Sequence, residues 1–119
     1  MRLAAALVVL ALGCKSTDYS KPVSVDELIA AGDDRVDHEA VVTGFVKPGS
    51  IERKIVDQRS QTTFIITKAG KELHIRHIGP VPDIFSDEAD VSVTGKLVRE
   101  SGQLVVVSEG DGLTAKRHF

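Results

Sequence analysis

Cysteine and aromatic residues are scarce in this sequence. Among 119 residues there is one cysteine, no tryptophan, four phenylalanines and one tyrosine. A single cysteine excludes an intrachain disulfide. With so few aromatic side chains, the core has to be built from valine, isoleucine and leucine, which favours strands. The length allows one domain, which buries roughly 60–65% of the surface of its unfolded chain.

An excess of positive charge is also lacking, since 15 Lys and Arg stand against 17 Asp and Glu. Nucleic-acid binding depends on clustered cations and stacking aromatic rings, so we expect no nucleic-acid partner. The sequence contains no nucleophile–base–orienter set, cysteine pair or phosphate-binding loop. Paired acids such as Asp87 and Glu88 fall in a predicted turn, where solvation is the simpler explanation. We therefore predict no enzyme and no metal site.

Residues 1–13 have the pattern of a targeting segment. Arg2 is followed by an apolar run of about ten residues, which is too short to span a bilayer, and Gly13 precedes Cys14. A small residue before a cysteine is the bacterial lipoprotein cleavage pattern, so we expect Cys14 to carry lipid. The alternative is an ordinary signal peptide with an incidental cysteine. The first interpretation predicts a membrane-anchored lipoprotein of the bacterial periplasm.

Residues 14–22 form a polar tether, and a short helix is expected over residues 23–31. Ser24 is a suitable N-cap, Glu27 stands three residues later in the capping-box position, and Gly32 ends the helix. Such a helix would pack against the mouth of a barrel. The acidic stretch around His38 that follows is interpreted as a solvated connector rather than a metal site.

Alternating apolar and polar residues predict five strands. Glycines inside the first and fourth of them, Gly44 and Gly95, suggest the bends that barrel closure requires. Residues 51–61 leave two alternatives open, an extension of the next strand or a long loop. The expected strands cover residues 40–47, 62–67, 73–78, 91–98 and 104–108.

Five short strands, a helix and a long crossing between strands three and four match the oligonucleotide/oligosaccharide-binding (OB) barrel. We predict this all-β, five-stranded Greek-key barrel over residues 23–112, followed by a flexible tail over residues 113–119. The rival architecture is an open antiparallel sandwich. Within the crossing, two apolar residues are expected to plug one barrel end. The residues predicted to be buried are Leu73, Ile75, Ile84, Phe85, Val91 and Val93.

His74 and His77 form an H-x-x-H pair. On a strand, side chains three positions apart point to opposite faces, so the two rings cannot hold one metal together. His74 belongs to the polar face. His77 follows Leu73 and Ile75 inward, and we interpret it as a partly buried, hydrogen-bonded ring at the barrel rim.

Two segments carry a resemblance to a known family. The first reads G-P-V-P-D-I-F over residues 79–85, followed by V-S-V-T-G over residues 91–95; the second reads V-T-G-F-V-K-P-G-S-I over residues 42–51. Both resemble the periplasmic haem chaperones of cytochrome c maturation, the CcmE family, and the similarity extends over residues 25–116. The resemblance implies an OB barrel and a haem-carrying function. The family has a transmembrane helix where this chain has the predicted lipoprotein cysteine.

The resemblance also implies a haem site in the tail. In the family, a histidine after the last strand attaches to a haem vinyl group, and a tyrosine four residues later ligates iron. Here Lys116, Arg117 and His118 offer two cations for the propionates and one imidazole. The motif is degenerate, since Arg117 stands at the histidine position in the simplest alignment and Phe119 follows His118.

The sequence and the resemblance together suggest two alternative functions. The first is a haem-binding chaperone of c-type cytochrome maturation, which passes haem to apocytochrome alongside other maturation proteins. His118 would be the attachment or ligation point, and Lys116 and Arg117 would pair with the propionates. The alternative is a lipid-anchored OB-fold binding or scaffold module that does not bind haem.

Overall fold

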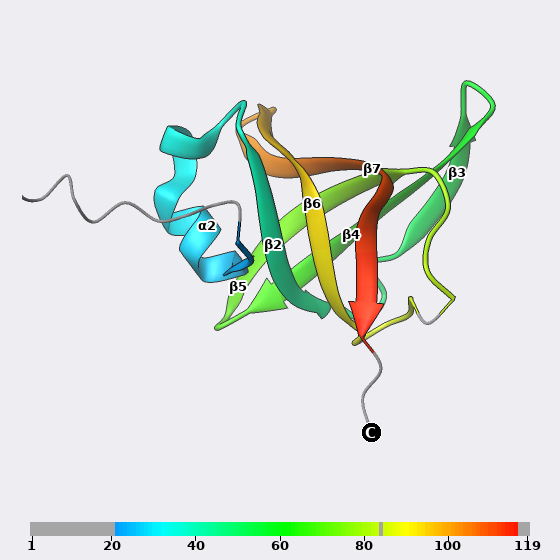
Figure 1. The fold of residues 1–119 in the computed structure, drawn as a ribbon, viewed down its shortest axis with the longest axis horizontal. Coiled ribbons are helices and arrows are strands. Elements are labelled where there is room, and N and C mark those ends of the chain that lie inside the picture. The colour runs from blue at the N-terminus through cyan, green and yellow to red at the C-terminus, as the bar shows by residue number, and fades with distance from the viewer. Residues whose placement is uncertain (1–20, 84, 117–119) are drawn as a thin grey trace, which may run out of the picture.

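The computed structural model describes residues 21–83 and 85–116 of the chain, and they form strands around one short α-helix (Figure 1). None of the helices in this part has the length and apolar character needed to cross a membrane. The elements in order are β1 Val23–Ser24, α2 Val25–Ala31, the 3-10 helix η1 Gly32–Arg35, β2 Glu39–Val46, β3 Glu52–Val56, β4 Arg59–Lys68, β5 Lys71–Ile78, β6 Asp90–Glu100 and β7 Gln103–Lys116.

The strands form one sheet in the order β1-β2-β6-β7-β5-β4-β3, and a further pairing between β2 and β4 closes it into a ring. In this closing pair Phe45 faces Thr67 and Val46 faces Ile66. β5 and β7 run parallel, while the other pairs around the ring are antiparallel. The five strands predicted from the sequence are therefore the five barrel strands, and the predicted all-β barrel is confirmed. Ring closure argues against the open sandwich.

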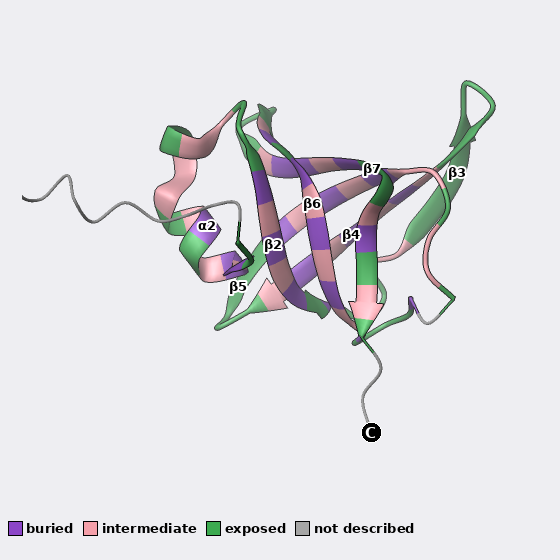
Figure 2. Cartoon of the chain, viewed as in Figure 1, coloured by how far each residue is buried: buried purple, intermediate pink, exposed green. Residues whose placement is uncertain are grey.

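The barrel strands β2, β4, β5 and β6 alternate between buried and more exposed residues, as Figure 2 shows along β2 and β6. Every second side chain points into the barrel because successive side chains of a strand point to opposite faces. Aliphatic residues dominate this interior, as the scarcity of aromatic residues indicated. The largest fully buried apolar side chains are Phe64, Leu28, Ile66, Leu73, Ile75 and Leu97.

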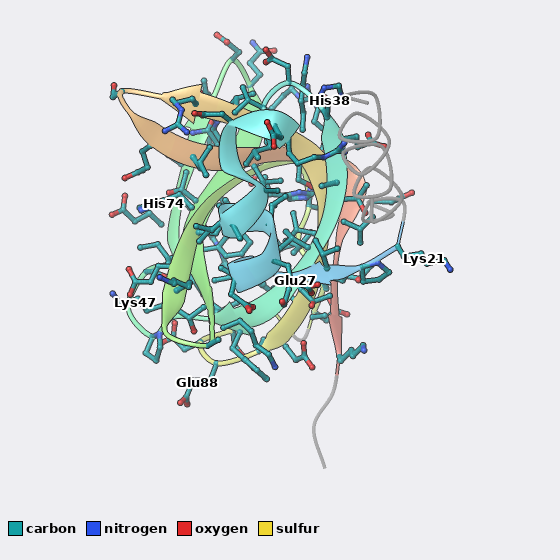
Figure 3. All side chains as sticks on the ribbon, turned by 90° about the vertical axis from the view of Figure 1, so that its left-hand side faces the viewer. Lys21, Glu27, His38, Lys47, His74 and Glu88 are labelled. Atoms are coloured by element: carbon teal, nitrogen blue, oxygen red, sulfur yellow. The ribbon has the colours of Figure 1, made fainter. Side chains whose placement is uncertain are left out.

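Helix α2 covers one end of the barrel and lies across it in Figure 3. Val25 and Leu28 are fully buried against the barrel. Gly44 makes room for Val25, because a Cβ at position 44 would lie 2.9 Å from Val25 Cγ2. The Ser24 amide donates to Glu27 Oε1 at 3.0 Å, which confirms the predicted capping interaction.

The side chain of Ser24 also binds the first turn of α2. Its hydroxyl donates to Asp26 Oδ1 at 2.6 Å. This hydrogen bond, assisted by nearby backbone amides and by Lys68, lowers the pKa of Asp26 below its usual value of 3.8. Since Asp26 is near the N-terminus of the helix, the charged carboxylate also suits the helix dipole.

The crossing between β5 and β6 packs Phe85 into the barrel, as predicted. Phe85 is 6% exposed, and its ring meets that of Phe64 edge-to-face with centroids 4.8 Å apart. Val46 fixes the far end of the crossing: its amide donates to Ala89 O, and its carbonyl accepts from the Glu88 amide. The predicted second plug residue, Ile84, lies outside the described residues.

The last strand is longer than predicted, because β7 continues to Lys116. The prediction of a flexible tail from residue 113 was wrong for residues 113–116. Leu113 is 4% exposed, and it pairs with Val93 of β6. The register shifts between Val93 and Gly95, so that residues 109–112 of β7 bulge opposite Thr94. A bulge of this kind bends a strand without ending it.

The segment that the sequence left undecided forms a β-hairpin. β3 and β4 are joined by a two-residue turn at Asp57 and Gln58, whose φ angles are 51° and 68°. Positive φ at both positions is the geometry of a type I′ turn, which matches the twist of hairpin strands. β3 pairs only with β4 among the described strands, and the hairpin projects from the barrel in Figure 1.

Candidate functional site

The residues predicted to form the haem site and the anchor fall mostly outside the described part of the chain. Cys14, Arg117 and His118 are not described. Lys116 is the last described residue; it ends β7, is exposed, and lies directly across from Asp90 of β6. The candidate site is therefore built from the barrel surface around Lys116.

A groove of about 390 Å³ lies on this surface and crosses β2, β6 and β7. The exposed ring of Phe45 contributes apolar surface, while Lys68 and Lys116 are the cationic residues of the lining. Phe45 is 37% exposed, and with Ile55 and Val56 it is one of three exposed large apolar side chains in the described part of the chain. The complete lining is Pro22, Thr43, Gly44, Phe45, Lys68, Asp90, Val91, Ser92, Thr114 and Lys116.

Phe45 and Lys68 also line a second depression of about 490 Å³, which lies beside the first at the β4–β5 turn. Lys68 Nζ lies 5.3 Å from the centroid of the Phe45 ring, within cation–π range. The β2–β4 pairing brings these two side chains together, since Phe45 faces Thr67 in that register. Sequence reasoning did not single out either residue. The sequence does contain one indication of the position of Phe45. Val42, Gly44 and Val46 are on the inward face of the strand, so Phe45, between the last two, points outward.

The arrangement suits an amphiphilic anion. An exposed aromatic ring offers a flat apolar contact, and the flanking ammonium groups can pair with carboxylates. Asp90 and Glu72 also line the two depressions, so the local charge is mixed rather than uniformly positive. This composition favours a ligand with both an apolar face and acidic groups over a simple polyanion.

A second polar group lies inside the barrel around His77. The ring is 0% exposed, its Nδ1 lies 2.9 Å from Ser108 Oγ, and its Nε2 lies 2.9 Å from the carbonyl oxygen of Pro80. A carbonyl only accepts, so Nε2 carries the hydrogen of the bond to Pro80, and Nδ1 pairs with the hydroxyl of Ser108. Thr62, which faces His77 across the β4–β5 pairing, has a buried hydroxyl without a partner among the described residues.

The structure confirms the interpretation of His77 as a hydrogen-bonded structural ring, and buries it more deeply than predicted. Both ring nitrogens are engaged and the ring is fully buried, so His77 could ligate iron only by giving up one of these hydrogen bonds. His74 lies on the opposite face of β5, half-buried, as the strand period predicted. In Figure 3 His38 and His74 lie away from the centre of the barrel. None of these three described histidines lines the groove at Phe45.

A family comparison matches most of the chain. Residues 20–115 match the model of the CcmE domain. The chain is 33% identical over 107 residues to the cytochrome c-type biogenesis protein CcmE of Psychrobacter arcticus, and 32% identical over 107 residues to the protein of the same name from Polaromonas naphthalenivorans. Each alignment covers 90% of this chain. It covers 60% of the first relative and 66% of the second, so the chain spans about two thirds of the length of these relatives or less.

A comparison of structures agrees on the fold. The barrel is similar to part of a solved structure assigned as an aspartyl-tRNA synthetase from Leishmania major Friedlin, with a TM-score of 0.58 and 10% sequence identity. The match covers 85% of this chain and 22% of that chain. At this identity the likeness concerns the architecture alone.

Proposed function

This chain belongs to the CcmE family of cytochrome c-type biogenesis proteins, and we propose that it carries haem to apocytochromes outside the cytoplasm. In this role haem is cargo, received from and passed to other proteins of the maturation pathway. The protein acts as a carrier and not as an enzyme. The observation that best supports the proposal is the groove at Phe45, which lies where β7 ends and the predicted haem-binding segment begins.

The groove fits the chemistry of haem. Haem has a flat apolar macrocycle with two carboxylates at one edge. The exposed ring of Phe45 would contact the macrocycle, and Lys68 and Lys116 would pair with the propionates. Lys116 was assigned this role from the sequence. Lys68, which lines the groove beside Phe45, is a second candidate for this role, and Arg117 is a third.

His118 would supply the imidazole that attaches or ligates the haem. It follows Lys116 by two residues, so it is close in the chain to the groove. β5 does not offer a substitute, since His77 is buried and bonded at both nitrogens and His74 does not line the groove. The proposal therefore makes haem binding depend on His118 and on Phe45 together.

A haem titration tests this proposal. The chain should give a Soret band that weakens in three variants: His118→Ala, Phe45→Ala and a chain lacking residues 117–119. Truncation at residue 117 is preferable to truncation at residue 113, because Leu113 is buried in β7. His38→Ala is the matched control, since His38 is an exposed histidine that does not line the groove. Equal haem affinity in the chain and all variants would exclude the proposal.

One observation favours the alternative, a lipid-anchored binding or scaffold module. Arg117 occupies the position at which the resemblance places the family's histidine. Under this alternative, Phe45 and its lysines would bind a different amphiphilic anion or a protein surface. A chain purified from haem-replete cells without a Soret band, and with no haem taken up in the titration, would support it.

The proposed location is the periplasmic side of a bacterial membrane, with Cys14 carrying lipid. A polar tether of residues 15–22 would join the anchor to β1. Two or more acyl chains hold a protein stably at a bilayer where one does not. Replacement of Cys14 by serine should release the protein from membranes or leave it unprocessed. Unchanged mass and partition of the Cys14→Ser chain would exclude the lipid anchor.

A further inference from the structure

We propose that the open edge of β3 binds an extended acidic segment of another polypeptide by adding it as a further strand. β3 ends the sheet order, all five of its residues are exposed, and Ile55 is 73% exposed. The open edge of a strand presents backbone donors and acceptors at the spacing of an extended chain. This inference does not depend on haem binding.

The hydrogen bonds of β4 show which backbone groups of β3 face outward. The carbonyl of Ser60, which faces Ile55 in the β3–β4 register, accepts from the Gly79 amide at 2.8 Å on the β5 side. In an antiparallel ladder a residue directs its amide and carbonyl to the same neighbour. The backbone groups of Ile55 therefore point away from β4, and alternation gives the same direction to those of Arg53. These two residues can exchange four hydrogen bonds with an added strand.

A second copy of this chain is a poor occupant of the edge. An antiparallel copy that used both outward residues would pair Arg53 with Ile55 of the second copy. Lys54 would then lie opposite Lys54 of the second copy in a non-hydrogen-bonded pair, with Cα atoms about 4.5 Å apart. Like charges directly opposite one another destabilise a strand pair. Lys54 thus disfavours self-association and leaves the edge to a different chain.

The side chains of β3 define the complementary sequence. Carboxylates are expected opposite Arg53 and Lys54, and neither cation has an ion pair with another described residue. Apolar residues are expected opposite Ile55 and Val56, which are 73% and 39% exposed. An antiparallel strand therefore reads, from its N-terminus, two apolar residues followed by two acidic residues.

Two synthetic peptides test the proposal: Thr-Val-Val-Glu-Glu-Thr and its counterpart with lysine in place of both glutamates. Amide chemical shifts and hydrogen exchange are measured on the isotope-labelled full chain. The acidic peptide should shift and protect the amides of Arg53 and Ile55, while the amides of Lys54 and Val56, already directed toward β4, should change less. The lysine peptide should bind about tenfold more weakly or not at all, because two charge pairs change sign.

Two variants separate the backbone contribution from the charge contribution. Ile55→Pro removes one outward amide without removing a bond to β4, and should abolish binding. Lys54→Glu should reverse the preference between the two peptides, and it keeps the test informative if the proline disturbs the hairpin. Lys71→Glu is the matched control, an exposed lysine at the start of β5, and should leave binding unchanged.

Several outcomes would overturn the proposal. They are equal binding of the two peptides, binding that survives Ile55→Pro in a folded hairpin, and protection of amides away from β3. If neither peptide bound, the role of Lys54 would be limited to disfavouring self-association at an edge that binds no partner. Concentration-dependent protection without any peptide would identify a second copy as the occupant, against the argument from Lys54.

Discussion

The barrel strand β2 and the outer hairpin strand β3 are both paired in the sheet but differ in burial. β2 alternates between buried and exposed side chains, whereas every residue of β3 is exposed, including Ile55 and Val56. The inner side chains of β2 face the opposite barrel wall and α2. No described element covers β3, and its contacts are with β4 (Figure 2). The difference shows that pairing in the sheet is enough to make a strand, while burial of its side chains requires a second layer.

The largest effect is expected from Phe85, which fills the barrel from the crossing. Phe85→Ala should lower the free energy of unfolding by about 3–5 kcal/mol, because it leaves a cavity beside Phe64. Equilibrium denaturant unfolding measures the change. A loss below about 1 kcal/mol would place Phe85 with the exposed residues of β3 rather than with the core.

A smaller effect is expected from Gly95 of β6, which lies beside the bulge of β7. A Cβ at this position would lie 2.3 Å from Val107 O, which is a backbone atom and cannot move without disturbing the β6–β7 pairing. Gly95→Ala should lower the free energy of unfolding by about 1–3 kcal/mol. Lys96→Ala, at the exposed neighbour, is the control and should change it by less than about 0.5 kcal/mol. Equal effects at the two positions would contradict the close approach.

The hairpin should tolerate change. Ile55→Thr keeps a β-branched side chain and removes apolar surface that is already in water, so the free energy of unfolding should change by less than about 0.5 kcal/mol. Thermal and denaturant unfolding both measure it. A loss above about 1.5 kcal/mol would show that Ile55 is covered in the free protein, and the contrast with the barrel would then fail.

The smallest effect concerns Asp26, at the helix that covers the barrel end. Its pKa is lower in the folded chain than the ordinary 3.8, so its contribution to stability is present above that value and is lost as pH falls through the folded pKa. Asp26→Asn should remove this part of the acid dependence between about pH 5 and pH 2. Parallel unfolding curves for the two chains across this range would refute the assignment.

The sequence predicted the barrel strands because their patterns are local. The period of two marks β2, β4, β5 and β6 within a few residues of their observed ends. β7 was predicted too short, since Gly110, Asp111 and Gly112 disfavour a strand by propensity. The bulge opposite Thr94 accommodates them, and the strand resumes with Leu113 in the core.

The candidate site was predicted only in part. Lys116 followed from the resemblance of the C-terminal segment to the family. Phe45 and Lys68 are far apart in the sequence, and they come together through the β2–β4 pairing that closes the barrel. No local pattern marks such a pair, because ring closure depends on the lengths and bends of all five strands.

The sequence by itself determined the all-β class, the capped helix, the inward direction of His77 and the family. These follow from side-chain periodicity, capping chemistry and short motifs, which act over a few residues. Tertiary structure alone decided which apolar residues stay in water, that Phe45 and Lys68 share a groove beside Lys116, and that β3 keeps an open edge. Burial and contact at these positions depend on segments distant in the chain, and the free energy of those contacts is absent until the barrel closes.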